Sequence, residues 1–402
     1  MNPSLEKVWK LLPKFLQDVI ATTVDRLSGH RIPGPATADP SKPIRLFISP
    51  ANYAGQGFRW ARAVEGNPSV SARNLVYAEI NPFGYDADFA VRWRAATHSR
   101  KWQRNQLEAL TTEFTHVLIE AEFPPLGGMF HENVSAQVSV LRDRGVSVAM
   151  VCHGSDIRLP SRHRERESWS PFVNDDWVTV EKLEKATVRN RELLDEIGAP
   201  TFVSTPGLLL DVPYAHFLPV VIDPVPWKTG SKPLRRKRLK VVHIPSNPLV
   251  KGTAEILEPL RALNDEGLIE YEQVTGVTHD QMPAIYGDCD IVLDQFRLGD
   301  YGVGACEAMA SGRLVISHVS EQARDHIASA TGLSLPIVEA NIDNIGSVIR
   351  DVINRPEFYS TIASRGPSFV RRVHDGSFSR AVLEQHFLFP GKPQGIGRGE
   401  AA

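Results

Sequence analysis

The 402-residue sequence has few cysteines, no long apolar run and almost no excess of charge of either sign. Its three cysteines are widely spaced and form no metal-ligand pattern, so we expect reduced thiols in a cytoplasmic protein. No apolar run approaches the roughly 20 residues that a transmembrane helix needs. The first thirty residues lack the continuous apolar segment and the cleavage site of a signal peptide. With a net charge of −2, the protein has no overall positive charge that would attract nucleic acid.

Two motifs of other enzyme classes are also missing. No Gly-x-Gly-x-x-Gly with an acidic residue ~20 positions later follows the first predicted strand, which disfavours a dinucleotide-dependent oxidoreductase. Asp288 and Asp290 form an Asp-x-Asp pair, but the second aspartate begins a predicted strand. We interpret this pair as structural and predict no metal site.

The length favours two domains, because one hydrophobic core seldom serves 402 residues. Strands and helices alternate in both halves, which predicts an α/β fold with mostly parallel sheets. The predicted strands lie at 44–49, 74–78, 116–120, 146–152, 201–204, 239–244, 269–275, 290–294 and 314–318. The predicted parts are an N-terminal helix and linker (1–43), a first domain (44–224), a linker (225–238), a second domain (239–390) and a tail (391–402).

Residues 5–28 carry a helical stripe of apolar side chains that Pro13 should interrupt. Lys7, Lys10 and Lys14 lie off this stripe. The pattern fits a helix on a membrane surface, and it equally fits a helix that packs on the body of the protein or on a partner subunit.

Two segments of the sequence are strongly charged. The run from Lys232 to Arg238 is basic and rich in proline and glycine neighbours, which predicts a solvated linker. The loop 159–176, with the sequence SRHRERESW, is either mobile or a contact for an anionic acceptor. Asp156 and Arg158, which precede this loop, are expected to pair with each other.

The segment from Asp288 to Val315 is the most informative part of the chain. A predicted strand ends at a polar, glycine-containing turn, which opens into a short helix that carries Glu307 and stops at Gly312. A strand, a glycine turn and a helix N-terminus favour a bound phosphate. A carboxylate just behind the phosphate can accept hydrogen bonds from sugar hydroxyls. The segment therefore predicts a nucleotide-sugar site.

The sequence resembles glycosyltransferase family 4 and its relatives of GT-B architecture over about residues 44–390. The matching segments are the NYAGQG turn, HGSDIR, the stretch from Ser204 to Asp223, KGT at Lys251 and DYGVGACEAMASGRLVI. The resemblance implies two Rossmann-like domains that face each other across a cleft. It also implies sugar transfer from a nucleoside diphosphate to an acceptor hydroxyl, with retention and without a metal or other cofactor.

The resemblance also implies roles for individual residues. Glu307 would hold the donor ribose, and Lys251 would meet the donor diphosphate. His153 would lie beside the reacting sugar, so His153 and Lys251 are the predicted catalytic residues. The other predicted donor-binding residues are Gly55, Gln56, Gly57, Val277, Asp300, Gly302, Val303 and Gly304.

The sequence departs from the family pattern at two positions. The first glutamate of the family's Glu-x7-Glu motif falls at Gly299, with Asp300 beside it, and the usual arginine before the lysine falls near Ser246. Three interpretations follow: Asp300 replaces the glutamate, the donor has changed, or the protein binds a nucleotide sugar without catalysis. A GT-B epimerase is a further alternative, for which the chain offers few acidic and histidine candidates.

We expect a cytoplasmic glycosyltransferase that uses a nucleoside-diphosphate sugar, with UDP favoured over GDP. The acceptor is a glycan, a lipid or a small molecule, and nucleic acid is not an expected partner. If the N-terminal helix lies on a membrane, contact is with its inner face. The sequence leaves the donor sugar, the acceptor and the oligomeric state open.

Overall fold

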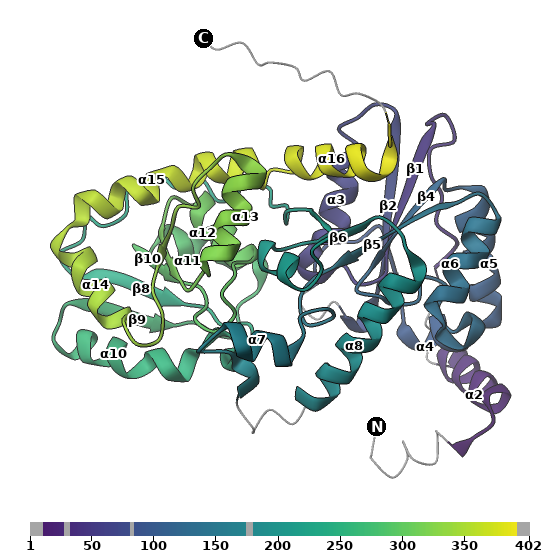
Figure 1. The fold of residues 1–402 in the computed structure, drawn as a ribbon, viewed down its shortest axis with the longest axis horizontal. Coiled ribbons are helices and arrows are strands. Elements are labelled where there is room, and N and C mark those ends of the chain that lie inside the picture. The colour runs from purple at the N-terminus through teal and green to yellow at the C-terminus, as the bar shows by residue number, and fades with distance from the viewer. Residues whose placement is uncertain (1–10, 28–32, 81–83, 174–179, 392–402) are drawn as a thin grey trace. The chain divides into compact units, whose positions relative to one another are not determined.

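The computed structural model describes most of the chain, namely residues 11–27, 33–80, 84–173 and 180–391. It contains two parallel β-sheets with helices packed on them (Figure 1), so the predicted α/β class is confirmed. Contacts divide the chain into two compact units, Met1–Val151 with Glu192–Thr201 and Arg380–Ala402, and Cys152–Arg191 with Phe202–Ser379. The predicted domain limits stay a prediction.

The first sheet has seven strands in the order β3-β2-β1-β4-β5-β6-β7, which begins as the Rossmann order does. The two strands predicted at 44–49 and 116–120 are confirmed, whereas the strand predicted at 74–78 begins earlier, at Val70. Two short strands, β3 and β7, were not predicted. The strands are β1 (Ile44–Ser49), β2 (Val70–Tyr77), β3 (Phe89–Val91), β4 (His116–Glu120), β5 (Ser147–Cys152), β6 (Thr201–Val203) and β7 (His216–Phe217).

The helix that follows Pro13 packs on one side only. The helix begins at Lys14, directly after the proline, and its Asp18 lies 3.1 Å from the His98 ring nitrogen of α4. Phe15 and Val19 remain exposed. The helices described before residue 200 are α2 (Lys14–Leu27), α3 (Gln56–Val64), α4 (Trp93–His98), α5 (Arg100–Thr112), α6 (Val134–Asp143), α7 (Pro160–Arg166) and α8 (Val180–Ile197).

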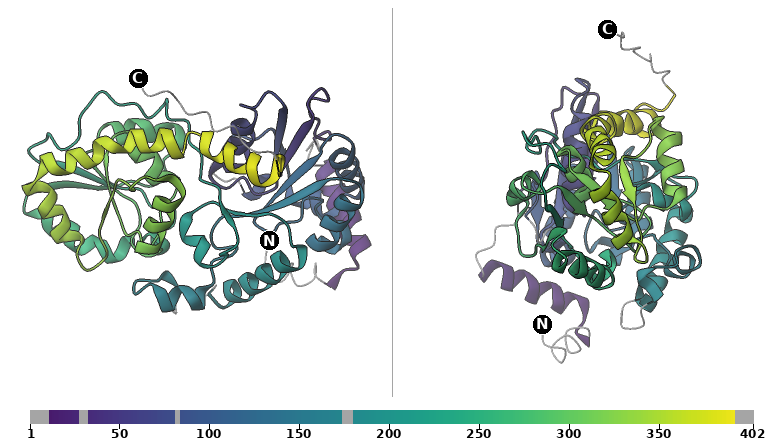
Figure 2. Two further views of the ribbon diagram at one scale, coloured as in Figure 1. Left: turned by 45° about the horizontal axis from the view of Figure 1, so that its top comes forward. Right: turned by 90° about the vertical axis from the view of Figure 1, so that its left-hand side faces the viewer.

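The second sheet has five strands in the order β12-β11-β10-β8-β9. Helices lie on both of its faces (Figure 2), and alternate strand residues enter two different core clusters. Val242 and Val292 belong to one cluster, while Val241 and Ile291 belong to the other, as expected for a sheet buried on both faces. Its strands are β8 (Leu239–His243), β9 (Ile269–Gln273), β10 (Ile291–Leu293), β11 (Leu314–Ser317) and β12 (Ile337–Glu339).

A long helix near the C-terminus was not predicted. The preceding helix ends at Asn354, and Pro356 then starts α15, a position that proline favours. Gly366 lets α15 approach α12 closely, because a Cβ there would lie 2.7 Å from the Met309 carbonyl oxygen. The helices are α9 (Pro248–Lys251), α10 (Thr253–Asp265), α11 (Met282–Gly287), α12 (Val303–Ala310), α13 (Glu321–Thr331), α14 (Ile345–Asn354), α15 (Pro356–Val373) and α16 (Ser377–Leu383).

The basic run from Lys232 to Arg238 has no regular secondary structure and is mostly exposed, as a solvated linker should be, and two of its arginines form ion pairs. Arg236 pairs with Asp288, and Arg235 pairs with Glu357. Asp290 accepts hydrogen bonds from the backbone amides of Leu234 and Lys240, which agrees with a structural role for the Asp-x-Asp pair. These contacts fix the basic run against the second sheet.

Part of the charged segment after Arg158 packs on the protein, and its residues Pro160–Arg166 form the helix α7. The Arg297 guanidinium donates to the carbonyl oxygens of Trp169 and Ser170. His163 lies buried with its Nε2 3.2 Å from the Leu298 carbonyl oxygen. His163, Trp169 and Ser170 therefore have defined partners, whereas Arg164 and Glu165 are exposed, and residues 174–176 lie outside the described part. Whether the loop is mobile or meets an anionic acceptor stays a prediction.

No helix in the described part of the chain has the length and the apolarity that crossing a membrane requires. Residues 5–10 of the predicted N-terminal helix lie outside the described part, with Lys7 and Lys10 among them. The predicted tail lies outside it from residue 392 onward.

Candidate functional site

A cavity of about 320 Å³ opens where the strand order of the second sheet reverses. Counted from β8, the sheet has the order 2-1-3-4-5, so the reversal lies between β8 and β10. Ligands of open α/β sheets bind at the carboxyl ends of the strands at such a point. Lys251 follows β8 and Asp294 follows β10, and both line the cavity. Its other polar lining residues include His153, Arg158, Thr205 and Asp300.

Lys251 is held at the mouth of the cavity by a short helix. The Asn247 side chain caps α9 by accepting from the amides of Leu249 and Val250, and Gly252 ends it with a positive φ of 75°. The Lys251 ammonium pairs with Asp294, which is buried. Lys251 therefore lines the cavity with a carboxylate partner that the sequence did not reveal, and its contact with a diphosphate stays a prediction.

Asp300 joins three loops around the cavity. Its Oδ2 accepts hydrogen bonds from Arg158 at 3.1 Å, from the Thr205 hydroxyl at 2.6 Å and from the Gly207 amide at 3.2 Å. Burial raises the pKa of the Asp300 carboxyl, and the positive charge of Arg158 opposes this rise. Asp300 thus places an arginine in the cavity, and its direct contact with a donor stays a prediction.

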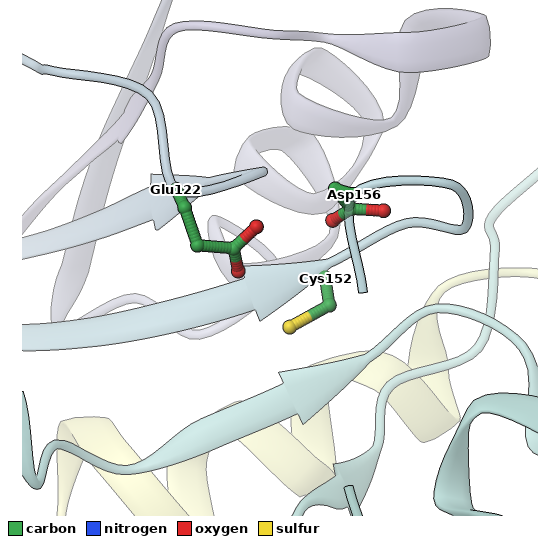
Figure 3. A group of neighbouring side chains, drawn as sticks. All are labelled: Glu122, Cys152 and Asp156. Atoms are coloured by element: carbon green, nitrogen blue, oxygen red, sulfur yellow. The ribbon is translucent and has the colours of Figure 1, made fainter. Parts of the chain in front are cut away.

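The expected pairing of Asp156 with Arg158 is wrong. The Asp156 carboxylate accepts hydrogen bonds from the backbone amides of His153 and Gly154 instead. Figure 3 shows this aspartate beside the end of β5, where Cys152 is the last strand residue, and it also shows Glu122, which follows β4. The turn that Asp156 closes orients His153 and Arg158 toward the cavity that both residues line.

Glu307 lies on α12, is buried and does not line the cavity. Its Oε1 lies 2.8 Å from the Nε2 of His279, and the His279 ring packs edge-on against Trp227. His279 was not among the residues predicted for the site. Its position just after β9, at a carboxyl end of the sheet, is the signal that could have identified it. Val277 lies two residues before this histidine.

Of the three residues predicted at the start of α12, namely Gly302, Val303 and Gly304, one lies in the cavity lining. Gly302 lines the cavity, and a Cβ there would meet no atom within 4 Å. Val303 and Gly304 form the first turn of α12, whose first amides have no partner within the helix. The Tyr286 hydroxyl lies 3.5 Å from the Gly304 carbonyl oxygen.

The turn after β1 has an evident packing role. Gly55 has a φ of 73° and starts α3, and a Cβ at Gly57 would lie 3.0 Å from the Glu120 carboxylate. That buried carboxylate accepts hydrogen bonds from the backbone amides of Ala51 and Asn52. Gln56 is buried beside them. The assignment of this turn to donor binding stays a prediction.

The chain resembles known proteins in its structure and not in its sequence. No protein-family model matches it, and no curated protein matches it in sequence. Among solved structures, a glycosyltransferase from Rickettsia africae ESF-5 has a TM-score of 0.53 at 11% identity, covering 86% of this chain and 97% of that chain. HepE of Anabaena in complex with UDP and glucose has 0.52 at 11% identity, covering 85% and 98%.

A third structure, sucrose-phosphate synthase from Thermosynechococcus elongatus, has a TM-score of 0.50 at 13% identity and covers 84% of this chain and 96% of its own. At such identities the similarity concerns the fold. It confirms the expected GT-B architecture, which agrees with the two parallel sheets described above.

Proposed function

We propose that the protein is a glycosyltransferase that moves a sugar from a nucleoside diphosphate, UDP rather than GDP, to an acceptor hydroxyl. The observation that carries this proposal is the cavity at the strand reversal of the second sheet, which is lined by Lys251 and Arg158. Two cations beside the glycine turn that opens α12 suit a diphosphate. The solved HepE structure, which contains UDP and glucose, supports the choice of ligand.

The positive charges of the cavity have a defined task in this reaction. The bond between the anomeric carbon and the diphosphate oxygen breaks, and negative charge develops on the leaving diphosphate. Lys251 and Arg158 stabilise that charge together with the first amides of α12, and the reaction needs no divalent cation. Both cations are held by buried carboxylates, Asp294 and Asp300, so they are oriented before the donor arrives.

Transfer proceeds with retention in this proposal. The acceptor oxygen forms its bond to the anomeric carbon on the face that the diphosphate leaves, and the acceptor proton passes to the departing phosphate oxygen. This course requires no carboxylate nucleophile. His153, which lines the cavity, lies beside the reacting sugar.

The alternative function is a nucleotide-sugar binder without catalysis. It is favoured by one observation: each cavity cation is already paired with a buried carboxylate, so a donor competes with Asp294 and Asp300 for them. The acceptor of the transfer reaction, and contact of α2 with a membrane surface, remain part of the proposal.

A ligand screen followed by a turnover assay tests both functions. A nucleotide sugar that binds the native state raises the melting temperature, so a panel of UDP and GDP sugars identifies the donor. Release of the nucleoside diphosphate, with or without an added acceptor, then separates an enzyme from a binder. If no member of the panel stabilises the protein, both functions are wrong.

A further inference from the structure

Asp294 presents a buried hydrogen-bond acceptor to the cavity. The residue directly follows β10, its side chain is 3% exposed, and it lines the cavity. Its Oδ1 pairs with Lys251. Its Oδ2 is buried and has no hydrogen-bond partner among the described residues. A buried carboxylate oxygen that lacks a partner is costly, and in a native protein it indicates a ligand or a bound solvent molecule.

The surrounding structure fixes this carboxylate in place. The Asp294 amide donates to the Ile316 carbonyl oxygen at 3.1 Å, which continues the pairing of β10 with β11. The next amide, that of Gln295, donates to the Ser317 hydroxyl at 3.3 Å. With its backbone held on both sides and Lys251 on one oxygen, Asp294 lines the cavity with a carboxylate whose other oxygen has no partner among the described residues.

The chemistry of that oxygen restricts the ligand group that it can meet. An ionised carboxylate only accepts hydrogen bonds, so its partner must carry an O–H or N–H group. Phosphate oxygens are acceptors and do not meet this requirement. A hydroxyl-bearing part of the ligand does.

The position of Asp294 identifies which part of a nucleotide sugar it meets. A Cβ built on Gly304 would lie 3.8 Å from the Asp294 Oδ1, so the carboxylate lies beside the first turn of α12. The unpaired amides of that turn favour a phosphate. A hydroxyl group within reach of Asp294 therefore belongs to a group attached to the phosphate.

We infer that Asp294 binds a hydroxyl group of the donor sugar and thereby determines which sugars the cavity accepts. The inference rests on the proposed function, because it assumes a nucleoside-diphosphate sugar as the ligand. In this arrangement the Lys251 ammonium contacts both the Asp294 carboxylate and the diphosphate, so the two negative groups lie near each other. A nucleoside diphosphate without its sugar therefore gains nothing from Asp294 and is repelled by its charge.

The variant Asp294→Asn distinguishes the contribution of the sugar to binding from that of the nucleoside diphosphate. The nucleotide sugar that stabilises the wild type most is chosen from UDP-glucose, UDP-galactose, UDP-N-acetylglucosamine and GDP-mannose. Calorimetric titration then gives its Kd and that of its parent nucleoside diphosphate. We expect D294N to weaken the nucleotide sugar roughly 10- to 100-fold, the range for a hydrogen bond to a charged group. The nucleoside diphosphate should bind D294N as tightly as it binds the wild type, or more tightly.

Asp288→Asn provides the matched control. Asp288 lies at the opposite end of β10, is mostly exposed and pairs with Arg236 and Lys240. The same loss of charge there should leave both affinities unchanged. If D294N still binds the nucleoside diphosphate, that binding also shows that the cavity of the variant is folded.

The remaining outcomes are distinct. Equal weakening of both ligands by D294N, or no change in either, overturns the role of Asp294 and leaves the proposed function intact. Failure of the wild type to bind any of the four nucleotide sugars overturns the proposed function, and this inference with it. If D294N does not fold, monodeoxy analogues of the chosen sugar test the wild type directly. At least one analogue should then bind 10-fold or more weakly, and equal binding of all of them overturns the inference.

Discussion

The carboxylate of Glu167 occupies the space that a side chain at position 299 would need. Gly299 has a φ of 64°, and a Cβ built on it would lie 2.4 Å from the Glu167 Oε1. Glu167 is held there by His318, whose Nε2 lies 2.9 Å from its Oε2. The family pattern has a glutamate at position 299, whereas here a residue distant in the chain brings a carboxylate to that place. The positive φ and the position of Glu167 therefore both favour glycine at this position.

Gly299→Ala should destabilise the protein more than the same change at a glycine in open space. Gly267 is the matched control, because its φ is 74° and a Cβ there would meet no atom within 4 Å. Backbone strain alone costs about 1 kcal/mol or slightly more at either position. At Gly299 the displacement of Glu167 adds to this cost, so urea unfolding should show the larger loss for G299A. Equal losses for the two variants would contradict the packing role.

His318 should make stability depend on pH in a defined window. Burial alone would lower the pKa of its imidazole, but hydrogen bonds to Glu167 and Glu339 outweigh burial and raise this pKa to about 9. The usual pKa of histidine is 6.5. A raised pKa in the folded state stabilises the protein fully below about pH 6.5, and this contribution disappears as the pH rises through about 9.

The size of this effect is on the order of 3 kcal/mol, because one pH unit of pKa difference corresponds to about 1.4 kcal/mol. Arg324 also pairs with Glu339, so replacing His318 leaves that carboxylate with a partner. Chemical unfolding between pH 6.5 and 9 should show a steeper loss of stability for the wild type than for His318→Gln. His326→Gln, a histidine that faces the Pro206 carbonyl oxygen, should keep the wild-type slope. Parallel curves for wild type and H318Q would contradict the prediction.

Glu307 should bind the ribose of the nucleotide. If the buried carboxylate accepts hydrogen bonds from ribose hydroxyls, the wild type should bind UDP about 10-fold or more tightly than 2′-deoxy-UDP. Glu307→Gln should weaken UDP and remove most of this discrimination. Glu321, at the start of α13, serves as the control for loss of a glutamate charge. Unchanged UDP affinity in E307Q would exclude Glu307 from the nucleotide site.

His279 should act on the nucleotide through Glu307. Its Nε2 lies 2.8 Å from the glutamate, so His279→Ala removes a partner that orients the carboxylate. We expect H279A to weaken UDP binding less than E307Q does. The double variant should be no weaker than E307Q alone, because the two residues act as one unit. Additive losses in titration would assign His279 a separate contact.

Much of the fold could be predicted because buried parallel strands leave a strong local signal. The strands at 44–49 and 116–120 are apolar runs that end at polar residues, and their predicted limits are those of the structure. The short strands β7 and β12 have two and three residues, too few for any periodicity. The helix α15 was missed because Gly366 and Pro367 in its interior both discourage helix in isolation, while packing against α12 favours it.

The site could be predicted only in part, because its residues are held in place by hydrogen-bond partners that are distant in the sequence. Lys251 and His153 were found at strand ends, and both line the cavity. Asp294 was overlooked although it directly follows a strand. The partners of Arg158 and Glu307 could not be predicted, because Asp300 is 142 residues from the former and His279 is 28 residues from the latter. Residue patterns predict strand ends but not which ends exchange hydrogen bonds.

Arg158 should be needed for stability at neutral pH because it is the cation beside Asp300. Both side chains are buried, and burial already raises the pKa of the Asp300 carboxyl. Arg158→Met removes the opposing charge, so this pKa rises further and the carboxylate is left buried without a cation. We expect a loss of about 3–5 kcal/mol at pH 7 to 8. A raised carboxyl pKa in the folded state stabilises the protein at low pH, so the loss should shrink as the pH falls toward 5.

The double variant R158M/D300N supplies the control for this explanation. It removes both charges, so it should recover much of the stability that R158M loses and should show no extra dependence on pH. Thermal and urea unfolding of the wild type, R158M, D300N and the double variant between pH 5 and 8 form the complete cycle. If R158M is equally destabilised at both ends of this range, or the double variant is as unstable as the two single losses added together, the cost arises from lost packing of the arginine stem rather than from a buried charge.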